Sequence, residues 1–375
     1  MPPQRRATDD GPDRDLRLDA CRGIALWFIY LNHIPDNVWS WLTPRHYGFS
    51  DATEIFMFVS GATCALAYGA VQRSDGWWAV VSHTLRRGLE IYVAFLTLIL
   101  AMVVVVYWTG NDQLADDANV NILLQQPGPA LAHAMTLQYR PVNTDILPVF
   151  VLYHLLFAPL LWFLLKAPSA VLAVSALLYV LVQIYGWNLP HWPAGDWYFN
   201  PFAWQFLVVL GAWWVVVGRK RLGALTSSCP MVALATAYLV FSLIVALSWS
   251  FKSLEALIPQ FLARLIYPID KSDLDPLRLL HFLAIAIVVA RFVPAGWQSL
   301  TRPVLRGAVR CGENSLEIYW IGVLLSLAAH LLLLRIGNAA AAQAAVSAAG
   351  IFLLVGCATL LTWIEIPSRR RTKLL

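Results

Sequence analysis

The chain has 375 residues, of which 59% are apolar and only 13% are charged, and its formal net charge is +5. Soluble globular domains have about 45–50% apolar and about 25% charged residues. The composition therefore excludes an ordinary soluble fold, a disordered chain and a nucleic-acid-binding protein. It predicts one polytopic, all-α membrane domain. Five widely spaced cysteines without a CxxC pair indicate neither a disulfide framework nor a zinc site, and no metal is expected.

The polar N-terminal segment has no apolar core followed by a cleavage site, so it is not a signal peptide. We expect residues 1–14 to be a disordered cytoplasmic tail, 15–365 to be a single transmembrane domain, and 366–375 to be a basic cytoplasmic tail. A span needs roughly 20 mostly apolar residues. About ten stretches qualify: 17–35, 51–71, 85–108, 145–165, 169–186, 201–218, 230–250, 277–293, 315–335 and 344–364.

Most lysine and arginine residues fall in the short segments on the side of the N-terminus. The positive-inside rule then places both termini in the cytoplasm. The long segments 109–144, 187–200 and 251–276 lie on the outer side and carry aspartates and tryptophans. These tryptophans form either an interfacial aromatic belt or a surface that stacks on carbohydrate.

The first span concentrates ionisable residues, which are costly in a membrane and indicate function. At 100° per residue, one narrow stripe of this helix carries Asp15, Asp19, Arg22 and His33. Arg22 lies near the inner end and His33, about 16 Å further along the axis, lies in the outer half. Pro35 ends the helix, so Asp36 could reach back to the imidazole of His33. The alternative is a buried histidine bonded to a neighbouring carbonyl group.

The outer ends of two more spans carry polar groups at a similar depth. Asp51 and Glu54 begin the second span on one face, and Asn143 and Asp145 begin the fourth. Asp51 could equally serve as a helix N-cap. The small residues 60–62 of the second span favour close helix packing. His154 lies on the face opposite Asp145, which favours a structural role.

The inner side carries arginines at the starts of the third and ninth spans: Arg86, Arg87, Arg306 and Arg310. Such residues either anchor the protein to lipid headgroups or bind a phosphate-bearing ligand, for which guanidinium groups are well suited. A histidine near a carboxylate is a general base held in one tautomer. An outer histidine site above inner phosphate-binding arginines suits transfer of an acyl group from a cytoplasmic thioester to an outer hydroxyl.

Several strings also resemble a known family, the OpgC branch of the integral-membrane acyltransferase family 3. They are RDLRLDACRGIAL, NHIPDNVWSW, GFSDATEIFMFVSGATCALAYG, NTDILPVFVLYHL and GENSLEIYW. The resemblance covers about residues 14–365, and it includes the spacing of ten residues between Arg22 and His33. It implies a bundle of about ten helices in the bacterial inner membrane, which succinylates osmoregulated periplasmic glucans. In that pattern His33 is the catalytic residue and Arg22 is the basic residue paired with it.

We therefore expect His33 to act as the base, with Asp36, Glu54 or Asp145 as catalytic partners. Arg22 and the four inner arginines would bind succinyl-CoA, a co-substrate rather than a permanently bound cofactor. Asp51, Asn143 and Arg140 would bind the substrate, either the glucan or the carboxylate of the acyl group. Arg45 on the outer side is a further candidate for binding that carboxylate. Membrane lipids are the other expected partners, and nucleic acid is not expected. The alternatives are an O-acetyltransferase acting on another extracellular polysaccharide, and a proton-coupled transporter that uses Asp19, Arg22 and His33.

Overall fold

The computed structural model describes residues 15–255, 258–294 and 297–372. Within these ranges the regular structure is helical, and the one β-type pairing is an isolated bridge between Pro190 and Asp196. This confirms the predicted all-α fold. The expected N-terminal tail, 1–14, lies outside the described residues. Of the expected tail 366–375, helix α17 (Ala340–Thr372) includes all but residues 373–375, which also lie outside the described part.

Eight helices of the described chain are long and apolar enough to cross a membrane, which is consistent with an all-α membrane protein. They coincide with eight of the ten predicted spans. These are α2 (Ala52–Asp75), α3 (Trp77–Thr109), α7 (Ile146–Lys166), α8 (Pro168–Tyr185), α9 (Pro201–Trp213) with its continuation to Thr226 through η3 (Trp214–Gly218) and α10 (Arg219–Thr226), α11 (Cys229–Ser248), α16 (Ser315–Ile336) and α17 as far as Ile364.

The remaining two predicted spans are helices α1 (Leu16–His33) and α14 (Pro276–Phe292). The first has Arg17, Asp19 and Arg22 among its 18 residues, and the second has only 17 residues. Both pack against other helices: α1 contacts α2, α15 (Pro303–Glu313), α16 and α17, and α14 contacts α11 and α2. The polar side chains of Asp19 in α1 and of Arg278 and His281 in α14 are buried against protein, which is how charged groups are accommodated in a helical membrane bundle. That these two helices cross the membrane stays a prediction.

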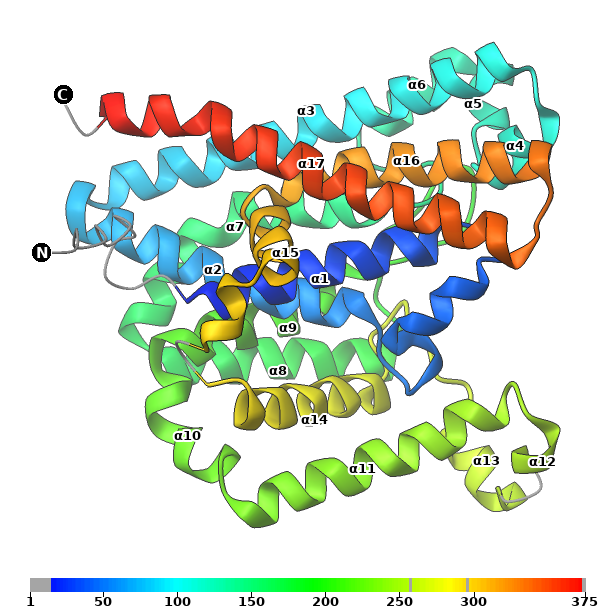
Figure 1. Cartoon of the computed structure of the whole chain (residues 1–375). Coiled ribbons are helices and arrows are strands. Elements are labelled where there is room, and N and C mark those ends of the chain that lie inside the picture. Colours follow the sequence, from blue (N-terminus) through cyan, green and yellow to red (C-terminus); the bar gives the residue numbers. More distant parts are fainter. Residues whose placement is uncertain (1–14, 256–257, 295–296, 373–375) are drawn as a thin grey trace, which may run out of the picture.

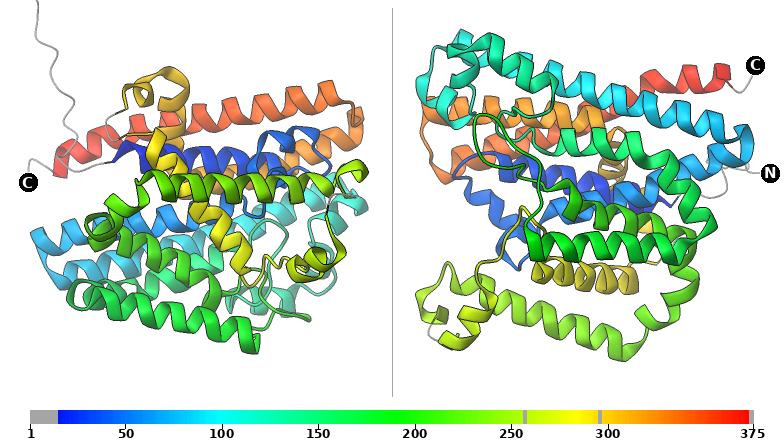
Figure 2. Two further views of the ribbon diagram at one scale, coloured as in Figure 1. Left: turned by 90° about the horizontal axis from the view of Figure 1, so that it is seen from below. Right: turned by 180° about the vertical axis from the view of Figure 1, so that it is seen from behind.

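Most of the helices run along one common direction, and short elements collect at one end of the bundle (Figure 1). We call this the loop-rich end. It includes η1 (Val38–Leu42), η2 (Pro44–His46), α4 (Asp112–Asp117), α5 (Asn121–Gln125), α6 (Pro127–Met135), α12 (Lys252–Glu255) and α13 (Gln260–Ile266). Helix α17 ends at the opposite end, toward which α10 also lies (Figure 2). The three long segments expected on the outer side meet here: Trp192 N–H donates to Gln138 O, and Asn200 N–H donates to Ser272 O.

Two helix pairs in the centre of the bundle touch backbone to backbone at glycines. A Cβ atom on Gly61 of α2 would lie 2.0 Å from the carbonyl oxygen of Val208 in α9, and one on Gly211 of α9 would lie 2.0 Å from that of Phe58. Helices α1 and α15 meet in the same way, since a Cβ on Gly23 would lie 1.8 Å from the carbonyl oxygen of Ala308. In lipid there is no hydrophobic driving force between helices. Small residues allow the close van der Waals packing that holds the helices together instead.

The α2–α9 contact predicts opposite effects for two glycines of the same helix. We expect Gly61→Ala to destabilise the protein by about 1–3 kcal/mol, because the added methyl group would have to push two backbones apart. At Gly69 the nearest atom to an added Cβ is 3.6 Å away on the flexible Arg73 side chain. Gly69→Ala is therefore the matched control and should be neutral or stabilising, since alanine favours helix by about 0.5–1 kcal/mol. Thermal unfolding in detergent measures both; equal stability of the two variants would contradict the packing argument.

Candidate active site

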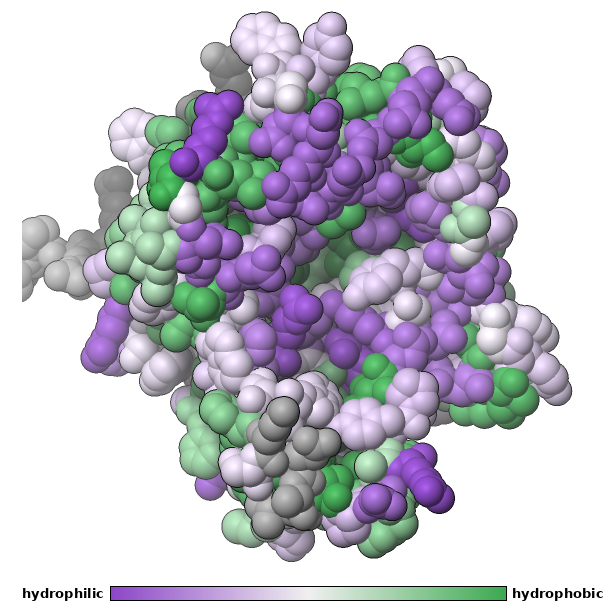
Figure 3. Space-filling model, turned by 90° about the vertical axis from the view of Figure 1, so that its right-hand side faces the viewer, coloured by the Kyte–Doolittle hydropathy of each residue, from purple (hydrophilic) through white to green (hydrophobic). Residues whose placement is uncertain are grey.

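A cavity of about 360 Å³ opens at the loop-rich end of the bundle. Figure 3 views this end and shows mostly hydrophilic side chains around a central hollow. The polar residues that line the cavity come from the end of α1, the segment before α2 and the first turn of α2, the segments before α7 and α9, the segment before α14 and the first turn of α14, and helix α16. They are Asn32, His33, Arg45, Ser50, Asp51, Thr53, Asn143, Asp145, Tyr198, Lys271, Arg278 and Tyr319. The structure thus brings together His33, Asp51, Asn143 and Asp145, which the sequence places in three separate segments.

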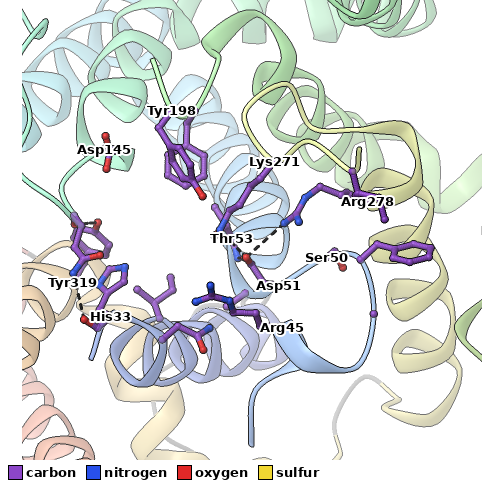
Figure 4. Close-up of a pocket in the computed structure, with 18 of the residues that line it drawn as sticks. His33, Arg45, Ser50, Asp51, Thr53, Asp145, Tyr198, Lys271, Arg278 and Tyr319 are labelled. Atoms are coloured by element: carbon purple, nitrogen blue, oxygen red, sulfur yellow. Dashed lines mark hydrogen bonds and ion pairs between the residues drawn. The ribbon is translucent and has the colours of Figure 1, made fainter. Parts of the chain in front are cut away.

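His33 is the last residue of α1, and its side chain faces this cavity (Figure 4). Its Nδ1 atom is buried and has no hydrogen-bond partner among the described residues. The ring lies edge-on to that of Tyr319, with 6.3 Å between centroids. The imidazole is therefore held by packing and faces the cavity with its hydrogen-bonding capacity unused.

Asp36 does not take the place expected for it. The chain leaves α1 at Ile34, and Asp36 adopts a left-handed backbone conformation with φ of 52°. Its side chain is exposed and lines neither the main cavity nor the second one described below. The carbonyl group of Asp36 accepts a hydrogen bond of 3.3 Å from Gln343 of α17. The structure thus places Asp36 away from the imidazole of His33.

Four charged side chains form one network in the cavity wall opposite His33. Asp51 binds Lys271 at 2.6 Å and Arg278 at 3.5 Å, and Arg278 also binds Glu54 at 2.6 Å. Glu54 is fully buried and completes a capping box with Asp51 at the start of α2. Both roles suggested for Asp51 are therefore combined, since it caps the helix and lines the cavity. Glu54 lies behind the wall, where its charge is compensated by Arg278.

Asp145 lines the cavity, while Arg140 lies behind it. The two side chains form an ion pair of 3.3 Å, and the guanidinium group of Arg140 stacks at 4.6 Å on the ring of Trp197. Arg140 is only 2% exposed and does not line the cavity. Its position therefore suits the orientation of Asp145 rather than direct contact with a substrate. Trp197 is also buried, so it belongs to this packing rather than to an exposed carbohydrate-stacking surface.

Asn143 lies in the turn before α7 and has the backbone φ of 67° that non-glycine residues rarely adopt. The hydroxyl group of Tyr319 donates a hydrogen bond of 2.6 Å to its carbonyl oxygen, and the Asn143 amide reaches the carbonyl oxygen of His33 at 3.5 Å. Residues held in such conformations cluster at functional sites. Tyr319 thus fixes the turn that carries Asn143 next to the catalytic candidate.

A second cavity, of about 190 Å³, shares part of its wall with the first. Asn32, His33 and Asn143 line both cavities. On its other side are His330 of α16 and Asp117 of α4, whose side chains are 2.8 Å apart. The His33 side chain is therefore shared between two hollows at the loop-rich end.

The arginines expected to bind the donor lie away from both cavities. Arg22 donates hydrogen bonds to the hydroxyl of Thr63 in α2 and, at 3.5 Å, to the carbonyl oxygen of Gly312 in α15. Arg86 and Arg87 pair with Glu90 at 3.1 and 2.9 Å.

The two remaining arginines belong to α15. Arg310 donates to the hydroxyl of Thr359 at 3.0 Å, and Arg306 is exposed. The structure thus distributes the five arginines over three helices. His154, expected to be structural, hydrogen-bonds the carbonyl oxygen of Phe150 at 2.9 Å.

The sequence did not single out seven of the polar residues that line the cavity: Asn32, Ser50, Thr53, Tyr198, Lys271, Arg278 and Tyr319. Tyr319 lies within the string GENSLEIYW, which already carried the resemblance, so that string was a usable signal. Lys271 and Arg278 were counted only as outer charges. Their partner Asp51 is more than 200 positions away, and no local spacing indicates such a pair.

The fold and this site define an all-α membrane protein with a charged cavity at one end of its helix bundle. A family model described as "OpgC protein" matches residues 14–366, which is nearly the whole chain. The chain belongs to the OpgC family, and this membership implies a transferase. Searches of curated proteins and of solved structures returned no match.

Proposed function

We propose that the protein transfers a succinyl group from cytoplasmic succinyl-CoA to hydroxyl groups of a periplasmic glucan. In this proposal about ten helices span the bacterial inner membrane, both termini are cytoplasmic, and the loop-rich end faces the periplasm. The observation that carries the proposal is the position of His33. An imidazole without a competing hydrogen bond faces a polar cavity in a chain of the OpgC family.

The reaction follows from the groups around that imidazole. His33 accepts the proton of a glucan hydroxyl as the oxygen attacks the thioester carbonyl, and a C–O bond forms. The tetrahedral intermediate then collapses, the C–S bond breaks, and the imidazolium returns its proton to the CoA thiolate. The side-chain amide of Asn143 is the nearest candidate donor to the oxyanion, because it already reaches the backbone of His33. Asp145, held by Arg140, would stabilise the imidazolium from across the cavity.

The donor would approach from the opposite end of the bundle. Arg22, Arg86, Arg87, Arg306 and Arg310 are the candidates for contacts with the CoA phosphates, because guanidinium groups bind phosphate in a bidentate manner. The pantetheine arm would then have to cover about the 16 Å that separates Arg22 from His33 along α1. Succinyl-CoA is a co-substrate in this scheme, and no permanently bound cofactor takes part.

A vesicle assay tests both the reaction and its sidedness. Purified protein is reconstituted into sealed vesicles that contain glucan, and succinyl-CoA labelled in the succinyl group is added outside. We expect labelled glucan inside the vesicles, and none in protein-free vesicles or when the glucan is added only outside. Movement of free succinate or protons without labelled glucan would contradict the proposal and favour a transporter. Label attached to the protein in the absence of glucan would replace direct transfer by an acyl-enzyme route.

A further inference from the structure

The charged groups of the main cavity are compensated, with one exception. Lys271 and Arg278 bind carboxylates in the wall, and Asp145 is bound by Arg140. Arg45 also lines the cavity, but its guanidinium group forms no ion pair or hydrogen bond with any described residue. The uncompensated positive charge of the cavity is therefore located on Arg45.

Arg45 is held on a turn that is anchored at both ends. It is the middle residue of η2, and the buried hydroxyl of Thr43 just before it donates to the side-chain oxygen of Asn32 in α1 at 2.9 Å. On its other side the ring of His46 stacks on that of Trp41, with 4.4 Å between centroids. Burial and the adjacent Arg45 lower the pKa of His46.

Arg45 is an exposed residue at the mouth of the cavity, and its guanidinium group extends from this turn toward the cavity. Figure 4 shows it extending into the cavity between His33 on one side and Asp51 on the other. A ligand that is attached to a carbonyl carbon next to His33 could therefore place a second polar group against Arg45 without leaving the cavity. The cavity volume is within the range of about 300–1,000 Å³ that is typical of small-molecule sites.

We propose that Arg45 binds the free carboxylate of the acyl group and so makes the site selective for a succinyl over an acetyl donor. This inference rests on the proposed function. A guanidinium group binds a carboxylate through two parallel hydrogen bonds, and the terminal carboxylate is the one charged group that distinguishes a succinyl from an acetyl thioester. A neutral sugar has no charge that would compensate the guanidinium group of Arg45. The free carboxylate of a succinyl group carries one negative charge and would compensate it.

Donor kinetics of Arg45→Gln test the inference. We expect kcat/KM for succinyl-CoA to fall about tenfold or more, mainly through KM, while transfer from acetyl-CoA stays unchanged. Arg45→Lys keeps the charge but not the fork, and it should lose only part of the preference. The matched control is Arg335→Gln, which removes an exposed arginine of α16 at the same end that lines neither cavity. Equal losses with both donors, or unchanged succinyl-CoA kinetics, would overturn the role of Arg45.

Binding of two esters tests the carboxylate site without turnover. Monomethyl succinate has one free carboxylate and an ester in place of the thioester, and dimethyl succinate has no carboxylate. We expect only the monomethyl ester to raise the melting temperature of the detergent-solubilised protein, and this shift to vanish in Arg45→Gln but not in Arg335→Gln. Shifts that do not depend on Arg45 would overturn the inference.

The two measurements also separate this inference from the proposed function. Wild-type transfer of succinate with no dependence on Arg45 in either measurement would leave the transferase proposal intact and remove the carboxylate site. An Arg45-dependent shift in a protein that transfers no acyl group would show a carboxylate site in a protein of another activity.

Discussion

Replacing His33 with alanine is expected to reduce succinyl transfer by roughly 10²- to 10⁴-fold, the usual contribution of a general base. The imidazole is the one titratable group that faces both cavities at the end of α1, whereas the neighbouring carboxylates Asp51 and Asp145 are already paired with cations. Among the described residues that line the main cavity, no other imidazole or unpaired carboxylate is therefore placed to accept the hydroxyl proton in its stead. The measurement is the initial rate of label transfer from succinyl-CoA to glucan by purified protein in detergent.

The control for this variant is His83→Ala, which removes an exposed histidine of α3 that lines neither cavity. It should transfer at the wild-type rate. Since His33 makes no side-chain hydrogen bond with a described residue, its loss should also leave the melting temperature almost unchanged. A His33→Ala protein that is folded and transfers at a near-wild-type rate would remove His33 from the mechanism.

The second large effect concerns the buried network around Glu54. Arg278→Met is expected to destabilise the protein by about 3–5 kcal/mol, because it leaves the fully buried carboxylate of Glu54 without its cation. Asp51 would keep Lys271 as its partner. Thermal or denaturant unfolding in detergent measures the loss.

A double variant separates the effect of charge from the effect of packing. In Glu54→Gln/Arg278→Met no uncompensated charge remains, and glutamine still serves at the third position of a capping box. We therefore expect the double variant to recover most of the stability lost in the single variant, since neutral replacements of buried ion pairs are often tolerated. A double variant as unstable as Arg278→Met would show that the arginine acts through its packing alone.

Sequence patterns predicted the helices well because apolar runs of this length have few alternatives. They also predicted that His33, Asp51, Asn143 and Asp145 would meet. That prediction needed only the assumption that all four lie at the same side of the bundle, and the structure places all four in one cavity.

The direction of side chains beyond the helix ends was not predictable in the same way. Asp36 was expected to reach back to His33, but it adopts a left-handed backbone conformation after the end of α1, and its side chain is exposed. Arg140 precedes a span in an outer segment and was expected to meet the substrate, yet it is buried against Trp197. Glu54 was expected to be catalytic because of its depth, and that depth instead reflects a buried ion pair. A helical wheel has no information on turns, and partners more than 200 residues apart leave no local pattern.

The glycine contacts in the centre of the bundle restrict how the site can open. A helix whose glycine lies against a backbone carbonyl group of its neighbour cannot rotate about its own axis. Rotation would bring a larger side chain into collision with that carbonyl group. Helices α1 and α2, which present His33 and Asp51 to the cavity, are both held in this way at Gly23 and Gly61. Adjustment to an incoming substrate therefore falls to the segments between helices, above all the turns that carry Arg45 and Asn143, while the helices serve as a fixed frame.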